Sequence, residues 1–325
     1  MPSAKVDVVG LGLNASDTVM MVRAFPALGG KERVVSSSIE AGGQTATAMV
    51  ACCRWGLEAR YIGRVGDDAG GRLQLASLRR EGVDTSYVRT VRGAATQFGC
   101  IFVDQSSGER TVFWDRDARL TVLPKELNHA AITASRALLL DGCDEGACLK
   151  AAKWARQARI PVVADLDTVY QHVDKLVPFI DYPIVSANFL SAFTGRSDPV
   201  KALEHLARTY KVRAPGVTLG RDGALVYESG RFHYSPGFVV EAVDTTGAGD
   251  VFHAAFVYGL LAGWDMARRL DFANAAAGLN CTALGARGGI KSVAEAERLM
   301  ATGKRHVNGA YQPGRTSAKR RKAAL

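Results

Sequence analysis

The stretch Asp244-Thr245-Thr246-Gly247-Ala248-Gly249-Asp250-Val251-Phe252 combines a polar turn, two glycines, an acid and the start of an apolar run. The apolar run continues to Leu261 without a proline, which predicts a buried helix. The turn before it therefore predicts a helix N-terminus, where free backbone N–H groups and aligned peptide dipoles attract anions. The glycines let an anionic ligand approach the backbone closely.

Asp250 places a carboxylate beside this expected anion site, and the local sequence leaves two interpretations open. An acid in the first turn of a helix often does no more than complement the helix dipole. A base next to an oxyanion site is also what phosphoryl transfer requires. His253 lies on the same helix face, and we expect a packed histidine there rather than a catalytic one.

Length and composition indicate an ordinary globular protein. The chain has 325 residues, 47% hydrophobic and 22% charged, which fits one large α/β domain or two small ones. It has no apolar run long enough to span a membrane, and its first residues lead into a strand-like run instead of a signal peptide. The six cysteines lack C-x-x-C spacing, which favours reduced thiols. We therefore expect a cytoplasmic protein without a membrane partner.

The formal net charge of +9 is concentrated at the C-terminal end. After Thr302 the chain has seven basic and no acidic residues, and without them residues 1–302 carry +2. We therefore expect a domain over residues 1–302 and a basic, disordered tail over 303–325. Such a tail can touch nucleic acid weakly, but a solvated tail without a nucleic-acid partner is the favoured interpretation.

The N-terminal half predicts a central strand and then strands that do not alternate with helices. Residues 5–13 form an apolar strand that contains the pattern Gly10-x-Gly12-x-x-Ala15. A dinucleotide-binding fingerprint would need a helix next, but β-rich residues follow instead. Four β-rich segments predict a small β-sheet lid, which spans about residues 16–40 and 94–116: residues 18–22, 34–39, 96–103 and 110–114.

Two places in this half are candidates for ligand contact. Asp17 lies where the first strand ends, a frequent ligand position at the carboxyl edge of a sheet, although aspartate is also a common turn residue. The pair Gly42-Gly43 precedes a helix of small residues over 45–55 and offers backbone donors at the helix start. A glycine pair alone is also typical of a simple turn.

From residue 130 onward, expected strands and helices alternate, which predicts a parallel sheet with helices on both faces. The turn from Gly220 to Gly223 then leads into an antiparallel edge ribbon over residues 224–234. We see no internal repeat and no linker. The predicted fold class is therefore α/β, with a doubly wound, mostly parallel sheet and a small β-sheet lid.

These elements and motifs resemble the ribokinase-like (PfkB-type) sugar kinases over roughly residues 5–300. The stretch 244–252 looks like the C-terminal signature of that family, and Gly42-Gly43 with residues 63–68 resembles its N-terminal signature. Within this family, the motifs most resemble those of fructokinase, ketohexokinase and sulfofructose-kinase-like members. It implies that the γ-phosphate of ATP is transferred to a hydroxyl group of a small carbohydrate, a ketose or related sugar, with Mg²⁺ as the metal.

The resemblance assigns roles to matching positions. Asp250 corresponds to the catalytic base, and the anion hole corresponds to Gly247, Ala248 and Gly249. The sugar site corresponds to Asp17, Gly42, Gly43 and Gln44. The nucleotide site corresponds to Asn188, Thr218, Gly220, Gly223 and Asn274. Many members bind a monovalent cation such as K⁺ at the positions of Asp244 and Thr246.

Two departures from the family pattern affect the sugar and the metal. Gln44 stands where many members have Asn, which leaves the sugar open. Many members carry Asn-Glu-x-Glu, but this chain has Asn188-Phe189-Leu190-Ser191, so we expect Mg²⁺ to be held mainly by the ATP phosphates and water. Lys31 in the lid is the candidate cation for binding a sulfonate group, but the favoured interpretation is that Lys31 is simply a solvent-exposed charge on the lid.

Several alternatives stay open at this point. The same fold could phosphorylate a nucleoside or another small alcohol, or serve as a non-catalytic sugar or nucleotide sensor, since the acids near Asn188 are missing. Arg116 and Asp115, after the second lid hairpin, could reach the substrate or form a salt bridge. Exposed lid strands also predict a homodimer through the lid.

Overall fold

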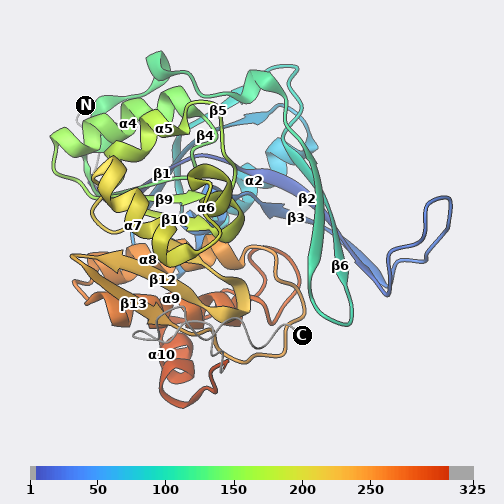
Figure 1. Ribbon diagram of the computed structural model, residues 1–325. Helices are drawn as coiled ribbons and strands as arrows, with labels where there is room; N and C mark the ends of the chain where they lie inside the picture. Colours follow the sequence, from blue (N-terminus) through green and yellow to red (C-terminus); the bar gives the residue numbers. More distant parts are fainter. Residues whose placement is uncertain (1–4, 307–325) are drawn as a thin grey trace.

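A nine-stranded, mostly parallel sheet forms the centre of the molecule (Figure 1). The structure is a computed structural model that describes residues 5–306. From one edge to the other the strands are β13 (Arg231–Ser235), β12 (Ala224–Glu228), β11 (Gly216–Thr218), β10 (Tyr182–Ser186), β9 (Val162–Leu166), β8 (Ser135–Leu140), β1 (Val6–Leu11), β4 (Ala59–Gly66) and β5 (Asp84–Val91). Only β12 and β13 pair antiparallel with their neighbours, which confirms the predicted edge ribbon.

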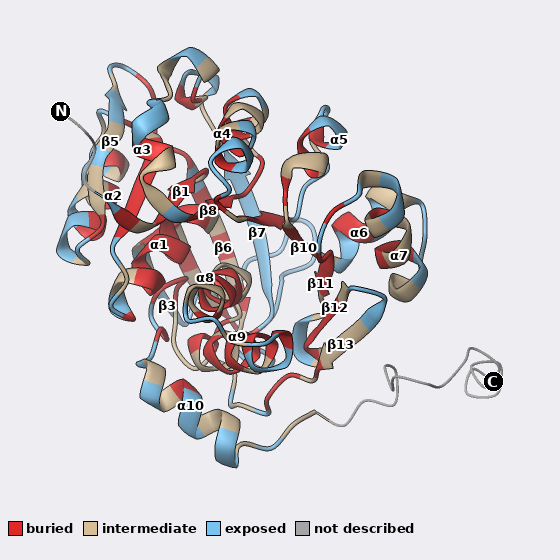
Figure 2. Ribbon diagram, turned by 90° about the vertical axis from the view of Figure 1, so that its left-hand side faces the viewer, coloured by how far each residue is buried: buried red, intermediate tan, exposed pale blue. Residues whose placement is uncertain are grey.

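Helices cover both faces of this sheet and close two apolar cores. One core lies under α1 (Gln44–Arg54), α2 (Ala69–Arg80), α8 (Ala248–Leu261), α9 (Met266–Asn280) and α10 (Val293–Thr302). The other lies under α3 (His129–Thr133), α4 (Glu145–Gln157), α5 (Val173–Leu176), α6 (Ala187–Thr194) and α7 (Pro199–Tyr210). Figure 2 shows the buried residues concentrated on the central strands and on α8 and α9. A parallel sheet covered on both faces explains why its strands are apolar throughout.

The first strand shows how the sequence produces this layering. Val8 belongs to one core and Val9 to the other, because successive side chains of a strand point to opposite faces. A Cβ on Gly10 would lie 2.6 Å from the Thr45 side chain and 2.8 Å from that of Met49. Gly10 therefore lets α1 pack closely on β1. The glycine pattern there serves helix packing and not a dinucleotide, as the missing helix after it predicted.

A separate four-stranded sheet projects from the main body and forms the predicted lid (Figure 1). Its order is β3 (Ser36–Gly42), β2 (Ala15–Val22), β6 (Phe98–Asp104) and β7 (Arg110–Asp115). β2 pairs antiparallel with β3 and parallel with β6, and β6 pairs antiparallel with β7. The pairing of Ala15 with Gly42 joins the base of the lid to the Gly-Gly turn. The residues predicted to contact a ligand on both segments thereby come close together at the sheet edge.

The chain departs from the sequence-based expectation at a few elements. β5 and α10 were not predicted, and β3 runs on to Gly42 instead of ending at residue 39. Beyond the predicted domain end at residue 302, Lys304 accepts a hydrogen bond from the amide of Val239, and the amide of His306 donates to Gly237. The rest of the predicted tail, residues 307–325, lies outside the described residues. Within residues 5–306, no helix is both long and apolar enough to cross a bilayer.

Candidate active site

A cavity of about 870 Å³ lies between the carboxyl ends of the parallel strands, the lid and the start of α8. Its wall combines residues from β2, the Gly-Gly turn, the lid strands β6 and β7, the end of β9 and the first turn of α8. The carboxyl edge of a parallel sheet is the usual ligand site of such folds. The cavity is large enough for a nucleotide and a small second substrate together.

The first turn of α8 contains the residues of the predicted anion site. Gly247 precedes the helix with a φ of 77°, and a Cβ there would lie 2.3 Å from the carbonyl oxygen of Ala286. Glycine is therefore required at this position. The amide of Val251 donates to the Gly247 carbonyl at 3.0 Å and starts the helical ladder. The earlier amides, of Gly249 and Asp250, have no carbonyl one turn back and stay available for an anion.

Asp250 has the electrostatic setting of a base that works near neutral pH. Burial and the nearby Asp165 carboxyl raise the pKa of Asp250 to about 7, while Arg110 and His253 oppose that rise. A carboxyl group with a pKa close to the working pH exchanges a proton efficiently. A helix-dipole acid on the surface would have no cause for such a raised pKa, so the structure favours the base interpretation.

Asp17, on β2, also lines the cavity. Its side chain is 7% exposed, and burial raises its pKa to about 6, while the Arg287 charge and the Gly99 amide lower it. A Cβ on Gly42 would come within 1.9 Å of an Asp17 carboxylate oxygen, so the glycine makes room for this carboxylate. The buried Arg287 donates to the Gly42 carbonyl at 2.9 Å and fixes the turn from below.

The remaining predicted sugar-site residues belong to the turn before α1. Gly43 and Gln44 line the cavity, whereas Gly42 lies behind its wall. Gly43 has a φ of 88°, and a Cβ there would lie 2.3 Å from the Asn14 Cα atom. The backbone at this position therefore requires glycine, and the next residue, Gln44, begins α1 at the cavity wall.

The structure adds cavity residues that sequence reasoning missed. Asp165 lies near the end of β9, Asp167 directly follows that strand, Gln97 precedes β6, and Tyr170 lies in the loop after β9; all four line the wall. The Gln97 side-chain oxygen is buried without a hydrogen-bond partner in the described part of the chain. A buried polar atom that faces a cavity is a natural ligand contact. The acids at the end of β9 could have been found from the rule that ligands bind beyond the carboxyl ends of strands.

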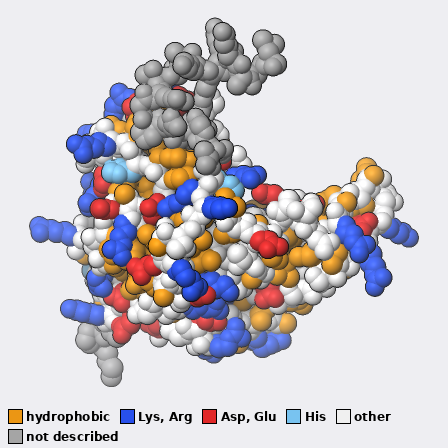
Figure 3. All heavy atoms as spheres, turned by 90° about the horizontal axis from the view of Figure 1, so that it is seen from below, with side chains coloured by type: hydrophobic (Ala, Val, Ile, Leu, Met, Phe, Trp, Pro, Cys, Tyr) orange, Lys and Arg blue, Asp and Glu red, His pale blue; other side chains and the backbone are white. Residues whose placement is uncertain are grey.

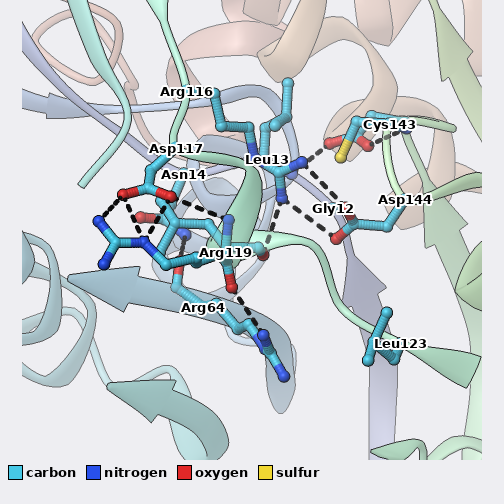
Figure 4. A network of polar contacts seen from close by, with 12 residues as sticks. Gly12, Leu13, Asn14, Arg64, Arg116, Asp117, Arg119, Leu123, Cys143 and Asp144 are labelled. Atoms are coloured by element: carbon cyan, nitrogen blue, oxygen red, sulfur yellow. Dashed lines mark hydrogen bonds and ion pairs between the residues drawn. The ribbon is translucent and has the colours of Figure 1, made fainter. Parts of the chain in front are cut away.

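Arg116 was predicted to contact either substrate or a carboxylate, and it does line the cavity. Its guanidinium group forms two hydrogen bonds to Asp144, at 3.0 and 3.3 Å, and one to the Leu120 carbonyl at 3.0 Å. Figure 4 shows Arg116 directed at Asp144, beside the pairing of Arg119 with Asp117. The Asp144 side chain is fully buried, so most of the Arg116 charge is balanced within the protein.

The nucleotide end of the cavity contains most of its predicted residues. Thr218, Gly220, Gly223 and Asn274 all line the wall. A Cβ on Gly223 would lie 2.0 Å from the Ser235 carbonyl oxygen. The Asn274 amide nitrogen donates to that same oxygen at 2.9 Å and to the Ser235 hydroxyl at 2.8 Å. The turn is therefore held tightly against β13, and its open side faces the cavity.

Two residues near the part of the cavity predicted to bind the nucleotide lie elsewhere than expected. Asn188, in the first turn of α6, is exposed and does not line the cavity, whereas Ser186 before it does. His306 lines the wall although it was expected in the tail. Arg305 beside it pairs with Asp271 at 3.0 Å and lies over the Phe238 ring, which fixes this end of the described chain.

The lid touches the turn that precedes α8 in this structure. The Gly108 carbonyl, in the turn between β6 and β7, accepts hydrogen bonds from the Thr245 amide at 3.0 Å and the Thr245 hydroxyl at 3.1 Å. Arg110 on β7 donates to the same hydroxyl at 3.0 Å. Lid closure thus brings a guanidinium group to the anion site, where its charge lowers the pKa of Asp250.

The predicted monovalent-cation residues lie just before this turn. Asp244 is fully buried, and its two carboxylate oxygens accept from the amides of Thr246 and Gly285, each at 2.8 Å. The Thr246 hydroxyl is buried and has no partner within residues 5–306. A carboxylate and an unpartnered hydroxyl are oxygen ligands of the kind that hard cations prefer.

Comparison with known proteins identifies relatives over most of the chain. The sequence profile described as pfkB family carbohydrate kinase matches residues 5–292. An ATP-dependent ribose-1-phosphate kinase from Halopiger xanaduensis is 29% identical over 271 residues, which cover 83% of this chain and 90% of the relative. A ribokinase from Bacillus subtilis is 27% identical over 295 residues, 89% of this chain and 98% of the relative.

Comparison of structures gives the same result. The crystal structure of a candidate ribokinase from Agrobacterium tumefaciens superposes with a TM-score of 0.85 at 28% identity, and covers 92% of this chain and 98% of its own. The predicted doubly wound fold with a lid is thereby confirmed. The relatives named here are not fructokinases or ketohexokinases, so the narrower resemblance to those enzymes gains no support from them.

Proposed function

Since the chain belongs to the pfkB family of carbohydrate kinases, we propose that it transfers the γ-phosphate of ATP to a hydroxyl group of a small sugar, with Asp250 as the base. The observation that carries this proposal is the position of Asp250. Its carboxyl group, with a pKa of about 7, belongs to the same helical turn as the anion site and lines the same cavity as Asp17. A phosphoryl group and its acceptor therefore have adjacent places.

The proposed mechanism needs positioning and charge neutralisation more than covalent chemistry. The sugar binds between Asp17 and the Gly43-Gln44 turn, with its hydroxyl groups donating to the Asp17 carboxylate. ATP binds toward Gly220 and Asn274, and its γ-phosphate accepts hydrogen bonds from the first amides of α8. Asp250 accepts the proton of the attacking hydroxyl group, while Arg110 balances the charge on the phosphate.

Mg²⁺ would be held mainly by the ATP phosphates and water, and it would neutralise phosphate charge during transfer. Asp244 and Thr246 fit a monovalent cation, because the buried Thr246 hydroxyl lacks a partner in the described residues. If K⁺ binds there, the apoprotein should melt at a higher temperature in KCl than in an equal concentration of tetramethylammonium chloride. Thr246→Val should remove that difference.

The charges at the sugar end support an uncharged, polyhydroxylated substrate such as a ketose or a pentose. Asp17, Asp165 and Asp167 line that region, and the Arg116 charge is balanced by Asp144. Lys31, the candidate cation for a sulfonate, lies on an exposed lid loop and does not line the cavity. A phosphorylated or sulfonated sugar would meet more negative than positive charge there.

A nucleoside is the second candidate acceptor, because aromatic side chains share the same wall. Phe98 and Trp114 of the lid are half exposed and face the cavity, and Tyr170 lies across from them. Aromatic rings stack on nucleobases and also cover the apolar face of a sugar. The rings alone therefore fit both acceptors, and the assay below separates them.

An ADP-release screen with ATP and Mg²⁺ tests the proposal. The panel contains ketoses, aldoses, sugar acids, sulfosugars, sugar phosphates and nucleosides, each with and without K⁺. We expect turnover with a neutral sugar, and a phosphate ester on one of its hydroxyl groups by ³¹P NMR. Turnover limited to nucleosides would favour the second candidate. ATP binding without ADP release for any acceptor would favour a sensor and contradict the kinase proposal.

We also propose a homodimer through the lid. The lid loop and strands expose apolar side chains that the main body does not cover, among them Phe25, Leu28, Val34 and Phe113. Figure 3 shows hydrophobic side chains along the projecting lid, with Lys and Arg side chains near its tip. Sedimentation of the full chain against Leu28→Asp tests this proposal: the wild type should be a dimer and the variant a monomer.

A further inference from the structure

His253 lies one helical turn after Asp250, inside α8, and is only 2% exposed. Its two ring nitrogens both face backbone carbonyl oxygens. Nδ1 lies 2.7 Å from the Gly249 oxygen, and Nε2 lies 2.8 Å from the oxygen of Ile184 in the middle of β10. The histidine therefore bridges the first turn of α8 and strand β10.

Hydrogen-bond chemistry limits the protonation state of this ring. A carbonyl oxygen can only accept, and a neutral imidazole has a single N–H donor. One of the two short contacts would then oppose two lone pairs. A protonated imidazolium has two donors and satisfies both contacts. The geometry around His253 is thus that of a cation.

A buried cation needs a counter-charge, and Asp165 supplies it. Its carboxylate, 8% exposed, lies 3.3 Å from His253 Nδ1 and lines the cavity. Burial lowers the pKa of His253 below its ordinary value and raises that of Asp165 well above its own, so the charge on His253 rests on its contacts with two carbonyl oxygens and a carboxylate. The two carbonyl hydrogen bonds and the Asp250 charge oppose the lowering of the His253 pKa.

The other charged groups near the pair come from three elements. Asp167 follows β9, Asp141 follows β8, and Arg110 reaches in from the lid strand β7. Asp167 favours a cation at His253, both acids raise the pKa of Asp165, and Arg110 lowers the pKa of Asp250. A positive His253 is therefore the group within α8 itself that offsets the carboxyls around Asp250.

We propose that His253 is a permanently protonated positioning residue, paired with Asp165, that fixes the first turn of α8 and keeps the Asp250 carboxylate available as the base. The role for Asp250 rests on the proposed function above, but the charge of His253 does not. Asp165 has a double part in this arrangement, since it balances His253 and presents an ionised oxygen at the cavity wall.

The charge on His253 can be measured directly. The chain has six histidines, so ¹⁵N-histidine labelling of the full chain gives few signals, and His253→Asn identifies the one from His253. We expect that signal to keep the imidazolium pattern, with two protonated nitrogens, at pH 8, where exposed histidines are neutral. A neutral tautomer at pH 7 would overturn the proposal, whether or not an acceptor sugar has been found.

The effect on Asp250 has a directional signature in the pH dependence of kcat. His253→Asn removes the cation, so the acidic side of the kcat–pH profile should shift to higher pH by about one unit. Asp165→Asn removes the anion, so the same side of the profile should shift to lower pH. At pH 6.5 the first variant should lose about tenfold in kcat, and at pH 9 it should approach the wild type. His205→Asn, on α7 and away from the cavity, should leave the profile in place.

A merely structural histidine would give a different result. Equal loss of kcat at every pH in His253→Asn, or profiles that shift the same way in both variants, would contradict the proposal. If no acceptor sugar supports turnover, the proposed function fails while the NMR measurement still decides the charge of His253. The two failures are therefore distinguishable.

Discussion

Replacement of Asp250 by Asn should stabilise the fold at alkaline pH. The native pKa of about 7 lies about three units above the ordinary aspartate value of 3.8. At about 1.36 kcal/mol per pKa unit, ionisation of Asp250 destabilises the native state by at most about 4 kcal/mol. Because Asp250 is only partly shielded from solvent, we expect about 1–3 kcal/mol for the isosteric Asn, which carries no charge.

The sign of this effect fixes its pH window. Between about pH 4 and 7 the unfolded chain has lost the Asp250 proton and the native state still holds it, so wild-type stability falls as the pH rises. The variant lacks this loss. The difference in free energy of unfolding should be near zero at pH 4, grow to pH 7 and stay level above pH 8.

Urea unfolding of both proteins between pH 4 and 9 measures this difference. Asp68→Asn is a matched control, because the Asp68 carboxylate accepts from Gly71 and Thr96 and its pKa is lowered. That variant should be less stable than the wild type by about the same amount across this range, because the lowered pKa of Asp68 places its pH-dependent part below about pH 4. A less stable Asp250→Asn at pH 8, or a difference that is the same at pH 4 and pH 8, would refute the reasoning.

Three further predictions follow from the site. Gly247→Ala should cost about 1–3 kcal/mol by urea unfolding, because its Cβ would meet the Ala286 carbonyl, whereas Gly249→Ala, with open space around its Cβ, should keep stability and lose kcat. Arg116→Ala should cost about 3–5 kcal/mol by leaving Asp144 buried and unpaired, and adding Asp144→Asn should recover part of that loss in the same assay. Deletion of residues 307–325 should leave the KM for ATP unchanged. Deletion from residue 304 onward should raise this KM, because it removes His306 from the cavity wall. Equal KM values for the two deletions would count against a nucleotide contact at His306.

The sequence was most informative where local chemistry decides the structure. The turn before Val251 needs Gly247 for its backbone conformation, and the helix after it is apolar on nearly every side, so both could be predicted from residue types. β5 escaped prediction because it is an edge strand, half exposed and rich in polar residues. α10 has only one buried residue, although its capping box of Ser292 and Glu295 is a signal that was available.

The site was harder to predict where folding joins distant segments. Arg110 reaches Thr245 only because the lid turn folds back over the main body. The role proposed for Asp165 depends on its contact with His253, which lies 88 positions further along the chain, in a helix packed on the sheet. No local pattern around either residue indicates such a partner. Family resemblance likewise placed Asn188 at the nucleotide, whereas the cavity wall contains Ser186.

The central claim is that Asp250 removes the proton from the acceptor hydroxyl group. Its most direct test is single-turnover transfer of the γ-phosphate to the best sugar of the screen, in wild type and Asp250→Asn, with the Kd for ATP measured on the same samples. We predict a loss of about 10²–10⁴-fold in the transfer rate and an unchanged Kd. Transfer at a near-normal rate in the variant would contradict the assignment.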